Sequence, residues 1–131
     1  MNRWICLTLT TISLTASAQY MPDDPPNEMG CLALLRVLPA KQIPAMKPYY
    51  DNIHEGSGKE MAEKLRSLAD SGDKDAQFTY GVLLLTGRCV PQDICAARKY
   101  REKSRGSVIN WEKRYPIPKE FEKQEAETVC N

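Results

Sequence analysis

The stretch that decides the fold is residues 73–106, DKDAQFTYGVLLLTGRCVPQDICAARKYREKSRG. Asp73 is a residue type favoured at a helix N-cap, and apolar residues then recur at helical spacing to about Thr86. Gly87 is suited to end this helix because glycine adopts the left-handed conformation without steric cost. Residues 90–93, VPQD, then turn the chain into a second helix. The stretch therefore predicts two helices joined by a short loop.

The first of these two helices is apolar on two opposite sides. One stripe is Ala76, Tyr80, Leu83 and Leu84, and the other is Phe78, Val82 and Leu85. A helix that is apolar on both sides is expected to lie between neighbouring elements. Two hypotheses remain open for the second stripe. It either forms a binding groove or packs beneath a helix predicted at residues 29–38.

Helical patterns also flank this stretch. Residues 59–72 carry apolar residues at helical spacing, and Ser57 with Glu60 predicts a capping box at the start of that helix. The helix at 29–38 is expected to stop at Pro39, and a helical turn is expected at 48–54. A charged helix is predicted from 118 to about 128, with Phe121 facing inward. No stretch has the alternating pattern of a β-strand.

Residues 73–106 resemble one unit of the Sel-one-like repeat family, a relative of the tetratricopeptide repeat. In that family small residues lie where two antiparallel helices cross, aromatic residues fill the space between the helices, and glycine ends the first helix. Residues 59–72 resemble the second helix of a preceding, degraded unit. The framework positions that carry the resemblance are Ala76, Tyr80, Gly81, Gly87, Val90, Asp93, Ala97 and Tyr100.

The resemblance implies an all-α fold, namely an antiparallel helix-turn-helix repeat, or short α-solenoid, with flanking capping helices. Residues 19–131 are expected to form one such domain, since a single repeat needs neighbours to complete its core. The chain departs from the family pattern in the loop, where Cys89 stands in place of a second glycine, and at Ser104 and Arg105, where the family has paired alanines.

Residues 1–18 predict an export signal peptide. Arg3 gives a positive start, residues 4–14 are mostly apolar, and Ala16-Ser17-Ala18 forms the small-x-small cleavage pattern, so cleavage is expected after Ala18. The apolar run is shorter than the roughly 20 residues that span a bilayer. The alternative is that this segment is an N-terminal core helix. Export predicts a periplasmic or secreted protein.

The charges of the expected mature chain are balanced. Arg3 is the only charged side chain in residues 1–18, so residues 19–131 carry 17 basic and 17 acidic side chains. Nucleic acids and anionic membrane surfaces are bound by an excess of lysine and arginine. The balance therefore favours a protein partner over nucleic acid or membrane insertion. It leaves a monomer or a small homo-oligomer open.

Four cysteines remain in the expected mature chain, namely Cys31, Cys89, Cys95 and Cys130. An even number in an exported protein predicts two disulfides. A zinc site is the alternative, but the cysteines form no CxxC pair and there is one histidine. Three pairings are possible. The short loop favours Cys89–Cys95, which leaves Cys31–Cys130 to join the two ends of the domain.

The sequence offers no set of residues arranged for catalysis, and we expect neither a bound metal nor a cofactor. His54 is the only histidine, so zinc-hydrolase and serine-triad arrangements cannot be assembled from the usual residues. His54 with Glu55 beside a Gly-Ser-Gly turn, or a carboxylate pair among Glu55, Glu60 and Glu63, is the alternative that would suit a small cell-wall or lactam hydrolase.

The sequence and the resemblance together lead to the expectation of an exported protein-binding module rather than an enzyme. The specific hypothesis is an immunity or inhibitor protein that binds and neutralises a toxic effector enzyme in the periplasm. The alternative within the same class is a scaffold or regulator of an envelope enzyme. Aromatic side chains dominate protein interfaces, so the predicted contact residues are Tyr49, Tyr50, Trp111 and Tyr115.

Overall fold

The computed structural model describes residues 28–54, 56–107 and 109–131, so the expected signal peptide lies outside the described residues. The described part is all-α, as predicted, with no β-strand, and none of its helices is long and apolar enough to cross a membrane. The elements are α1 (Glu28–Leu35), the 3-10 turns η1 (Pro39–Gln42) and η2 (Pro44–Met46), α2 (Lys47–Asp51), α3 (Ser57–Asp70), α4 (Lys74–Thr86), α5 (Ile94–Ser104), α6 (Trp111–Arg114) and α7 (Lys119–Glu127).

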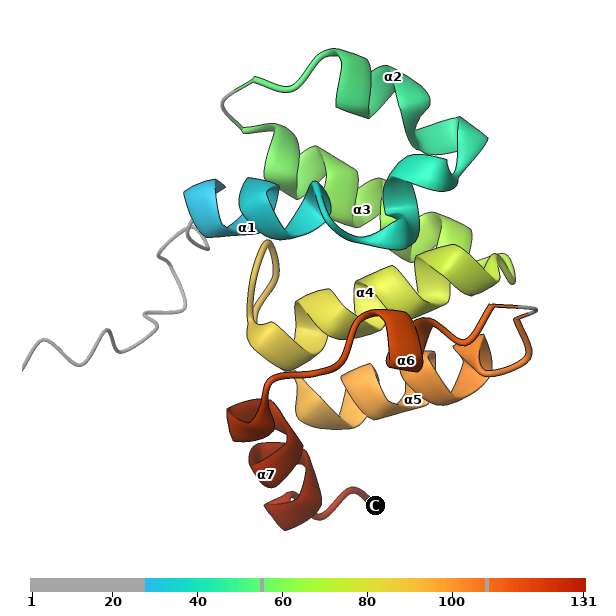
Figure 1. Cartoon of the computed structure of the whole chain (residues 1–131). Helices are drawn as coiled ribbons and strands as arrows, with labels where there is room; N and C mark the ends of the chain where they lie inside the picture. Colours follow the sequence, from blue (N-terminus) through green and yellow to red (C-terminus); the bar gives the residue numbers. More distant parts are fainter. Residues whose placement is uncertain (1–27, 55, 108) are drawn as a thin grey trace, which may run out of the picture.

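Helix α4 is the centre of the fold. Helices α3, α4 and α5 lie side by side in chain order, and α4 contacts both neighbours as well as η1 (Figure 1). Every α4 residue from Ala76 to Leu85 is buried, which confirms the expectation that this helix is covered on both sides. Helix α1 packs against α3, α6 lies in front of α4 and α5 in Figure 1, and α7 packs against α5.

Aspartates cap both helices of the hairpin, Asp73 as predicted and Asp93 in addition. The Asp73 carboxylate accepts a hydrogen bond from the Ala76 N–H at 2.9 Å, and the Asp93 carboxylate accepts one from the Ala96 N–H at the same distance. Gly87 has a φ of 67° and ends α4 in the left-handed conformation. Local residue types thus determine where α4 and α5 begin and where α4 ends.

Gly81 allows α4 and α5 to cross closely. A Cβ atom at this position would lie 2.7 Å from Cγ of Arg101 and 3.2 Å from the carbonyl oxygen of Ala97. Tyr80 and Tyr100 fill the adjoining space, with ring centroids 5.0 Å apart and planes at 85°. The framework positions therefore have the packing roles expected from their sizes, and Ala76 and Ala97 are fully buried.

The start of α3 differs from the sequence prediction. Ser57 does not cap the helix, because its Oγ accepts the His54 N–H at 2.9 Å in the preceding turn. The N-cap position is held by Gly56, whose φ of 87° suits glycine, and no side chain caps the helix there. The capping box proposed for Ser57 and Glu60 is therefore wrong.

Helix α1 is shorter than the predicted helix at residues 29–38. It ends at Leu35, and the N–H of Val37 bonds to the carbonyl oxygen of Leu34 in a tighter final turn. Leu38 has an extended backbone, with φ −83° and ψ 159°. A residue before proline is disfavoured in the helical conformation, so Pro39 excludes Leu38 from the helix.

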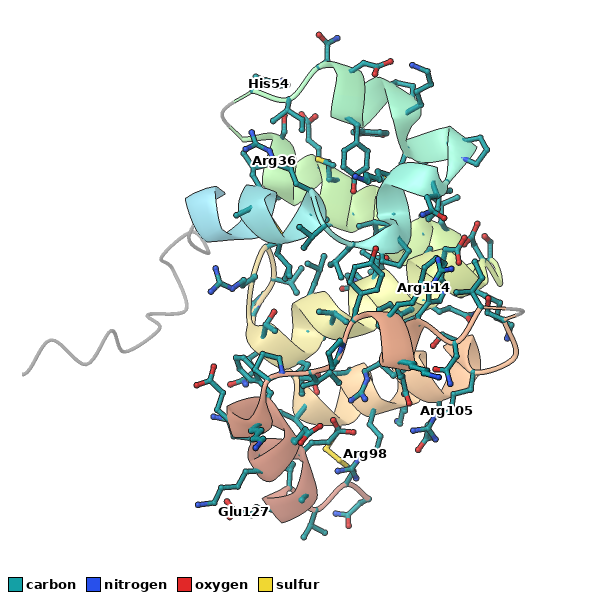
Figure 2. The ribbon with its side chains drawn as sticks, in the orientation of Figure 1. Arg36, His54, Arg98, Arg105, Arg114 and Glu127 are labelled. Atoms are coloured by element: carbon teal, nitrogen blue, oxygen red, sulfur yellow. A yellow bond between two sulfur atoms is a disulfide. The ribbon has the colours of Figure 1, made fainter. Side chains whose placement is uncertain are left out.

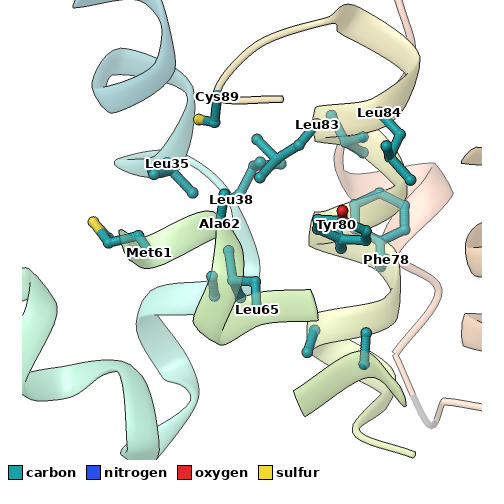
Figure 3. Close-up of a cluster of buried hydrophobic side chains, with 14 of the residues drawn as sticks. Leu35, Leu38, Met61, Ala62, Leu65, Phe78, Tyr80, Leu83, Leu84 and Cys89 are labelled. Carbon is teal, nitrogen blue, oxygen red and sulfur yellow. The ribbon is translucent and has the colours of Figure 1, made fainter. Parts of the chain in front are cut away.

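The hydrophobic core lies between α1, α3 and α4 (Figure 3). The largest fully buried side chains come from all three helices and from the segment after α1. Each such side chain contributes about 1.5–3 kcal/mol through removal of apolar surface from water. They include Leu35, Leu38, Met46, Met61, Leu65, Phe78, Leu83 and Leu85.

The structure confirms two disulfides but shows that the favoured pairing was wrong. Cys31 is bonded to Cys89 with a Cα–Cα distance of 4.8 Å, and Cys95 is bonded to Cys130 at 5.5 Å. The bridges span 58 and 35 residues, so they restrict the unfolded chain far more than a Cys89–Cys95 bridge would. Cys89, with a φ of 65°, is buried beside α1, whereas Cys95 lies in the first turn of α5.

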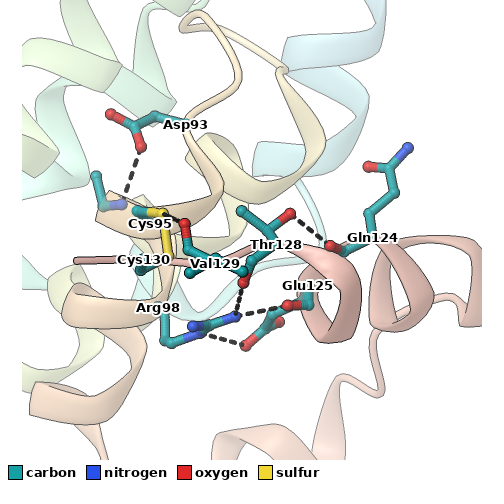
Figure 4. Close-up of a disulfide and its surroundings, with 9 residues drawn as sticks. Asp93, Cys95, Arg98, Gln124, Glu125, Thr128, Val129 and Cys130 are labelled. Carbon is teal, nitrogen blue, oxygen red and sulfur yellow. Dashed lines mark hydrogen bonds and ion pairs between the residues drawn. A yellow bond between two sulfur atoms is a disulfide. The ribbon is translucent and has the colours of Figure 1, made fainter.

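The C-terminal helix α7 is held against α5 by charge as well as by the disulfide (Figure 4). Arg98 donates to the carbonyl oxygen of Glu125 at 2.6 Å. Arg101, only 7% exposed, forms an ion pair with the carboxylate of Glu125 and a second one with Glu112 at 3.5 Å. Pro118 precedes α7 as predicted, and Phe121 packs against the core.

Candidate functional site

Trp111, predicted as a surface contact, is 2% exposed, so that prediction is wrong. Its indole N–H donates to the Asp75 carboxylate at 2.7 Å. Its ring centroid lies 6.5 Å from that of Phe78 and 6.0 Å from that of Tyr115. Trp111 therefore fastens α6 to α4 and is not available to a partner.

Tyr49 and Tyr50 are half-buried and not the exposed pair that was expected. The Tyr50 hydroxyl donates to the carbonyl oxygen of Leu35 at 2.9 Å, which connects α2 to the end of α1. Burial raises the pKa of Tyr50 to about 12, since the charged phenolate is poorly solvated there. Tyr50 is thus a structural residue, and Tyr49 also packs against the core.

Tyr115 belongs to a different surface, an apolar groove of about 550 Å³. One wall is α1 and the turn that follows it, with Ala33 and Leu34 on the helix and Val37 just after it. The floor is α4, where Val82 and Leu85 lie. The other wall is residues 114–121, which we call the strap. Its apolar lining residues are Tyr115, Pro116, Ile117, Pro118 and Phe121.

The groove answers the question that the second stripe of α4 left open. Phe78 is completely buried, and its ring lies 6.4 Å from that of Tyr115. Val82 and Leu85, further along α4, form the groove floor. Val82 and Leu85 are also buried, at 8% and 0% exposed, so the whole stripe is packed and its last two residues lie beneath the groove.

The middle of the strap, residues 115–118 between α6 and α7, is extended because of its prolines. Tyr115 and Ile117 each precede a proline, which disfavours the helical conformation at both positions. Pro118 has φ −54° and ψ 141°, and α7 begins directly after it. The short extended segment between α6 and α7 thus lies opposite α1. The Pro-Ile-Pro sequence was the available signal for it, but the sequence alone did not place it beside α1.

Each wall of the groove is fastened by one disulfide. Cys31 on α1 is bonded to Cys89, the neighbour of the lining residue Arg88. Cys130, after α7, is bonded to Cys95 on α5. Because both bonds lead back to the α4–α5 hairpin, α1 and α7, whose first turn ends the strap, are tied to the same element. This fastening favours a preformed groove.

Charged side chains lie at the edge of the groove. Arg88, Arg114 and Glu120 line it and are exposed. The Arg114 guanidinium lies over the Trp111 ring, 5.7 Å from the centroid. Neither arginine forms an ion pair within the described residues. The lining therefore combines an apolar floor with two exposed guanidinium groups and one carboxylate.

The His54 and Ser57 side chains meet in a local turn, not in a catalytic pair. The Nδ1 atom of His54 lies 2.8 Å from the carbonyl oxygen of Asn52 and 3.1 Å from Ser57 Oγ. A carbonyl oxygen only accepts hydrogen bonds, so Nδ1 carries the proton and cannot take one from the serine. Ser57 is 2% exposed, which also shields its hydroxyl from a substrate.

Glu60 and Glu63 are exposed on α3, and Glu55 lies outside the described residues. The four cysteines are bonded in pairs, so a zinc site made of them is excluded. In residues 28–54, 56–107 and 109–131 no group of three or more His, Cys, Asp or Glu side chains could hold a metal ion.

Fold and groove together define an all-α protein stapled by two disulfides around a central helical hairpin. No protein-family model, curated protein or solved structure matches the chain. The resemblance of residues 73–106 to the Sel-one-like repeat stays a prediction.

Proposed function

We propose that this chain is an exported, non-catalytic protein-binding module, and that it inhibits a toxic effector enzyme in the periplasm. The observation that carries the binding half is the apolar groove between α1, α4 and the strap. Val37, at the edge of the groove, is 55% exposed. A half-open groove with apolar side chains left in water is typical of a binding surface.

The rigidity of the groove supports tight binding. Both walls are connected by disulfides to the α4–α5 hairpin, and Arg101 anchors α7 through Glu125. A surface that is already ordered loses little conformational entropy when a partner binds. A stable interface buries about 800 Å² on each partner, so the contact is expected to extend from the groove over α1 and the strap.

The inhibitory role rests on the sequence resemblance and on the expected export. Disulfides form in oxidising compartments, so the two bridges support a periplasmic or secreted location. A protein that occludes an enzyme needs a rigid surface and no catalytic groups of its own. If the captured enzyme keeps its activity when bound, the alternative of a scaffold or regulator replaces inhibition.

The test uses the mature chain as bait in a periplasmic extract, with two matched variants. Val37→Asp places a charge at the groove edge, and Val129→Asp places one at the other exposed large apolar residue of the described part, which is 86% exposed and outside the groove. We expect wild type and Val129→Asp to retain the same partner and Val37→Asp to lose it by about tenfold or more.

The captured protein is then assayed with increasing amounts of the mature chain. We expect its activity to fall to the baseline at a molar ratio of one to one. Equal capture by all three baits would show that the groove is not the binding surface, and undiminished activity at saturation would refute inhibition.

A further inference from the structure

Three exposed arginines make no ion pair within the described residues, namely Arg36, Arg88 and Arg114, and two of them line the groove. The other arginines of this part are paired. Arg66 lies 3.9 Å from Asp70, Arg98 and Arg101 pair with Glu125, and Arg105 lies 3.4 Å from Glu112. Figure 2 shows Arg36 beside α1 and Arg114 beside α6.

Arg88 and Arg114 come from separate elements. Arg88 directly follows Gly87 at the end of α4, and its neighbour Cys89 is bonded to α1. Arg114 is the last residue of α6, where the strap begins. Both flank a groove whose floor is apolar. An ion pair beside an apolar surface is screened less by water than one in open solvent. A carboxylate that binds here therefore gains more binding free energy than one on a flat polar surface.

We infer that the groove binds a partner segment that combines apolar side chains with aspartate or glutamate carboxylates, and that Arg88 and Arg114 each offer a guanidinium group to such a carboxylate at the edge of the groove. The inference rests on the proposed function and names the chemistry of the partner. The apolar side chains occupy the space above Val82 and Leu85. The guanidinium groups donate to these carboxylates and determine the register of the segment.

The charge balance of the groove fits this chemistry. Its lining holds two guanidinium groups and one carboxylate, Glu120, so its formal charge is +1, although the expected mature chain has equal numbers of acidic and basic groups. The preference for an acidic segment is therefore local to the groove. Because the groove is open to solvent on one side, it suits a segment of a folded partner better than an enclosed small molecule.

The test is selection of a phage-displayed library of random dodecapeptides, which have no free C-terminus, on the disulfide-bonded mature protein. We expect enrichment of peptides with apolar residues and at least one aspartate or glutamate. Their affinity should fall about tenfold for the double variant Arg88→Gln/Arg114→Gln and weaken with added salt. Arg36→Gln is the matched control, because it removes an exposed unpaired arginine that does not line the groove, and it should leave affinity unchanged.

The outcomes separate the two proposals. This inference is overturned if the selected peptides need Val37 but bind the arginine double variant as well as the wild type. It is also overturned if they still bind after their carboxylates are replaced by amides. In both cases the groove remains a binding site. Peptides insensitive to Val37→Asp, or no enrichment at all, overturn both. A dimer or a bound fatty acid that disappears in Val37→Asp also contradicts the inference, because the occupant would then be a second copy or a lipid.

Discussion

Cys89 lies in the loop between α4 and α5 and Cys95 in the first turn of α5, and their disulfides lead to opposite ends of the described chain. Cys89 is bonded to α1, which is one wall of the groove. Cys95 is bonded to Cys130, just beyond α7, whose first turn belongs to the other wall. The α4–α5 hairpin, which also supplies the groove floor, therefore holds both sides of the groove in place.

Removing the two bridges separately should have distinct local effects. We expect Cys31→Ser/Cys89→Ser and Cys95→Ser/Cys130→Ser each to lose about 4 kcal/mol of unfolding free energy, given loops of 58 and 35 residues. Urea unfolding measures the loss. Hydrogen exchange should rise in α1 for the first variant and in α7 for the second. Non-reducing peptide mapping of the wild type that recovered a Cys89–Cys95 peptide would contradict this assignment.

Gly81→Ala should destabilise the fold although alanine favours helices. The added Cβ would lie 2.7 Å from Arg101 Cγ, so Arg101 must move away from Glu125 or the two helices must separate. We expect a loss of about 1–3 kcal/mol in thermal or urea unfolding. Gly106→Ala is the control, because its Cβ would meet only Lys74 atoms at 3.5 Å or more. If both variants had wild-type stability, the close crossing of α4 and α5 would be refuted.

Stability should fall in alkaline solution as buried tyrosines ionise. The pKa of Tyr50 is raised from 10.0 to about 12 by burial. Its folded-state pKa is therefore above the unfolded value, so its contribution to stability is complete below pH 10 and is lost as the pH rises towards 12. Burial and the hydrogen bond to Asp70 raise the pKa of Tyr100 to about 12, so Tyr100 adds to the same decline.

Tyr50→Phe isolates the contribution of Tyr50. The variant has no phenol proton to lose at this position, so the unfolding free energy should decline less steeply than in the wild type between pH 10 and 12. At neutral pH it should be about 1 kcal/mol less stable, because the hydrogen bond to Leu35 is gone. Denaturant unfolding at a series of pH values measures both effects. A decline as steep as that of the wild type would show that Tyr50 ionises equally easily in both states.

The helices of the hairpin could be predicted because their signals are local. Asp73, Gly87 and Asp93 act on backbone groups within a few residues of themselves. The structure shows Asp73 and Gly87 in the expected roles and Asp93 as a second N-cap. The burial of α4 also followed from its own pattern of apolar residues. Residue type and spacing contain this information without reference to distant parts of the chain.

The disulfide pairing and the groove depend on contacts between distant residues. Short separation favoured Cys89–Cys95, but the structure places Cys89 beside α1 and Cys95 beside the C-terminal tail. Trp111 looked like an interface residue because aromatic side chains suit both interfaces and cores. Its partner, Asp75, is 36 residues away in sequence. No local pattern reports such contacts, so the strap could not be placed opposite α1 from the sequence.

The most direct test of the groove as the binding surface is hydrogen–deuterium exchange of the mature protein, alone and with its captured partner. The account predicts added protection in residues 30–38 and 114–121, which contain the two walls of the groove, and none in η1, η2 or α2, which contribute no lining residue. Protection confined to η1, η2 and α2, or to the exposed face of α3, with the groove walls unchanged, would contradict it.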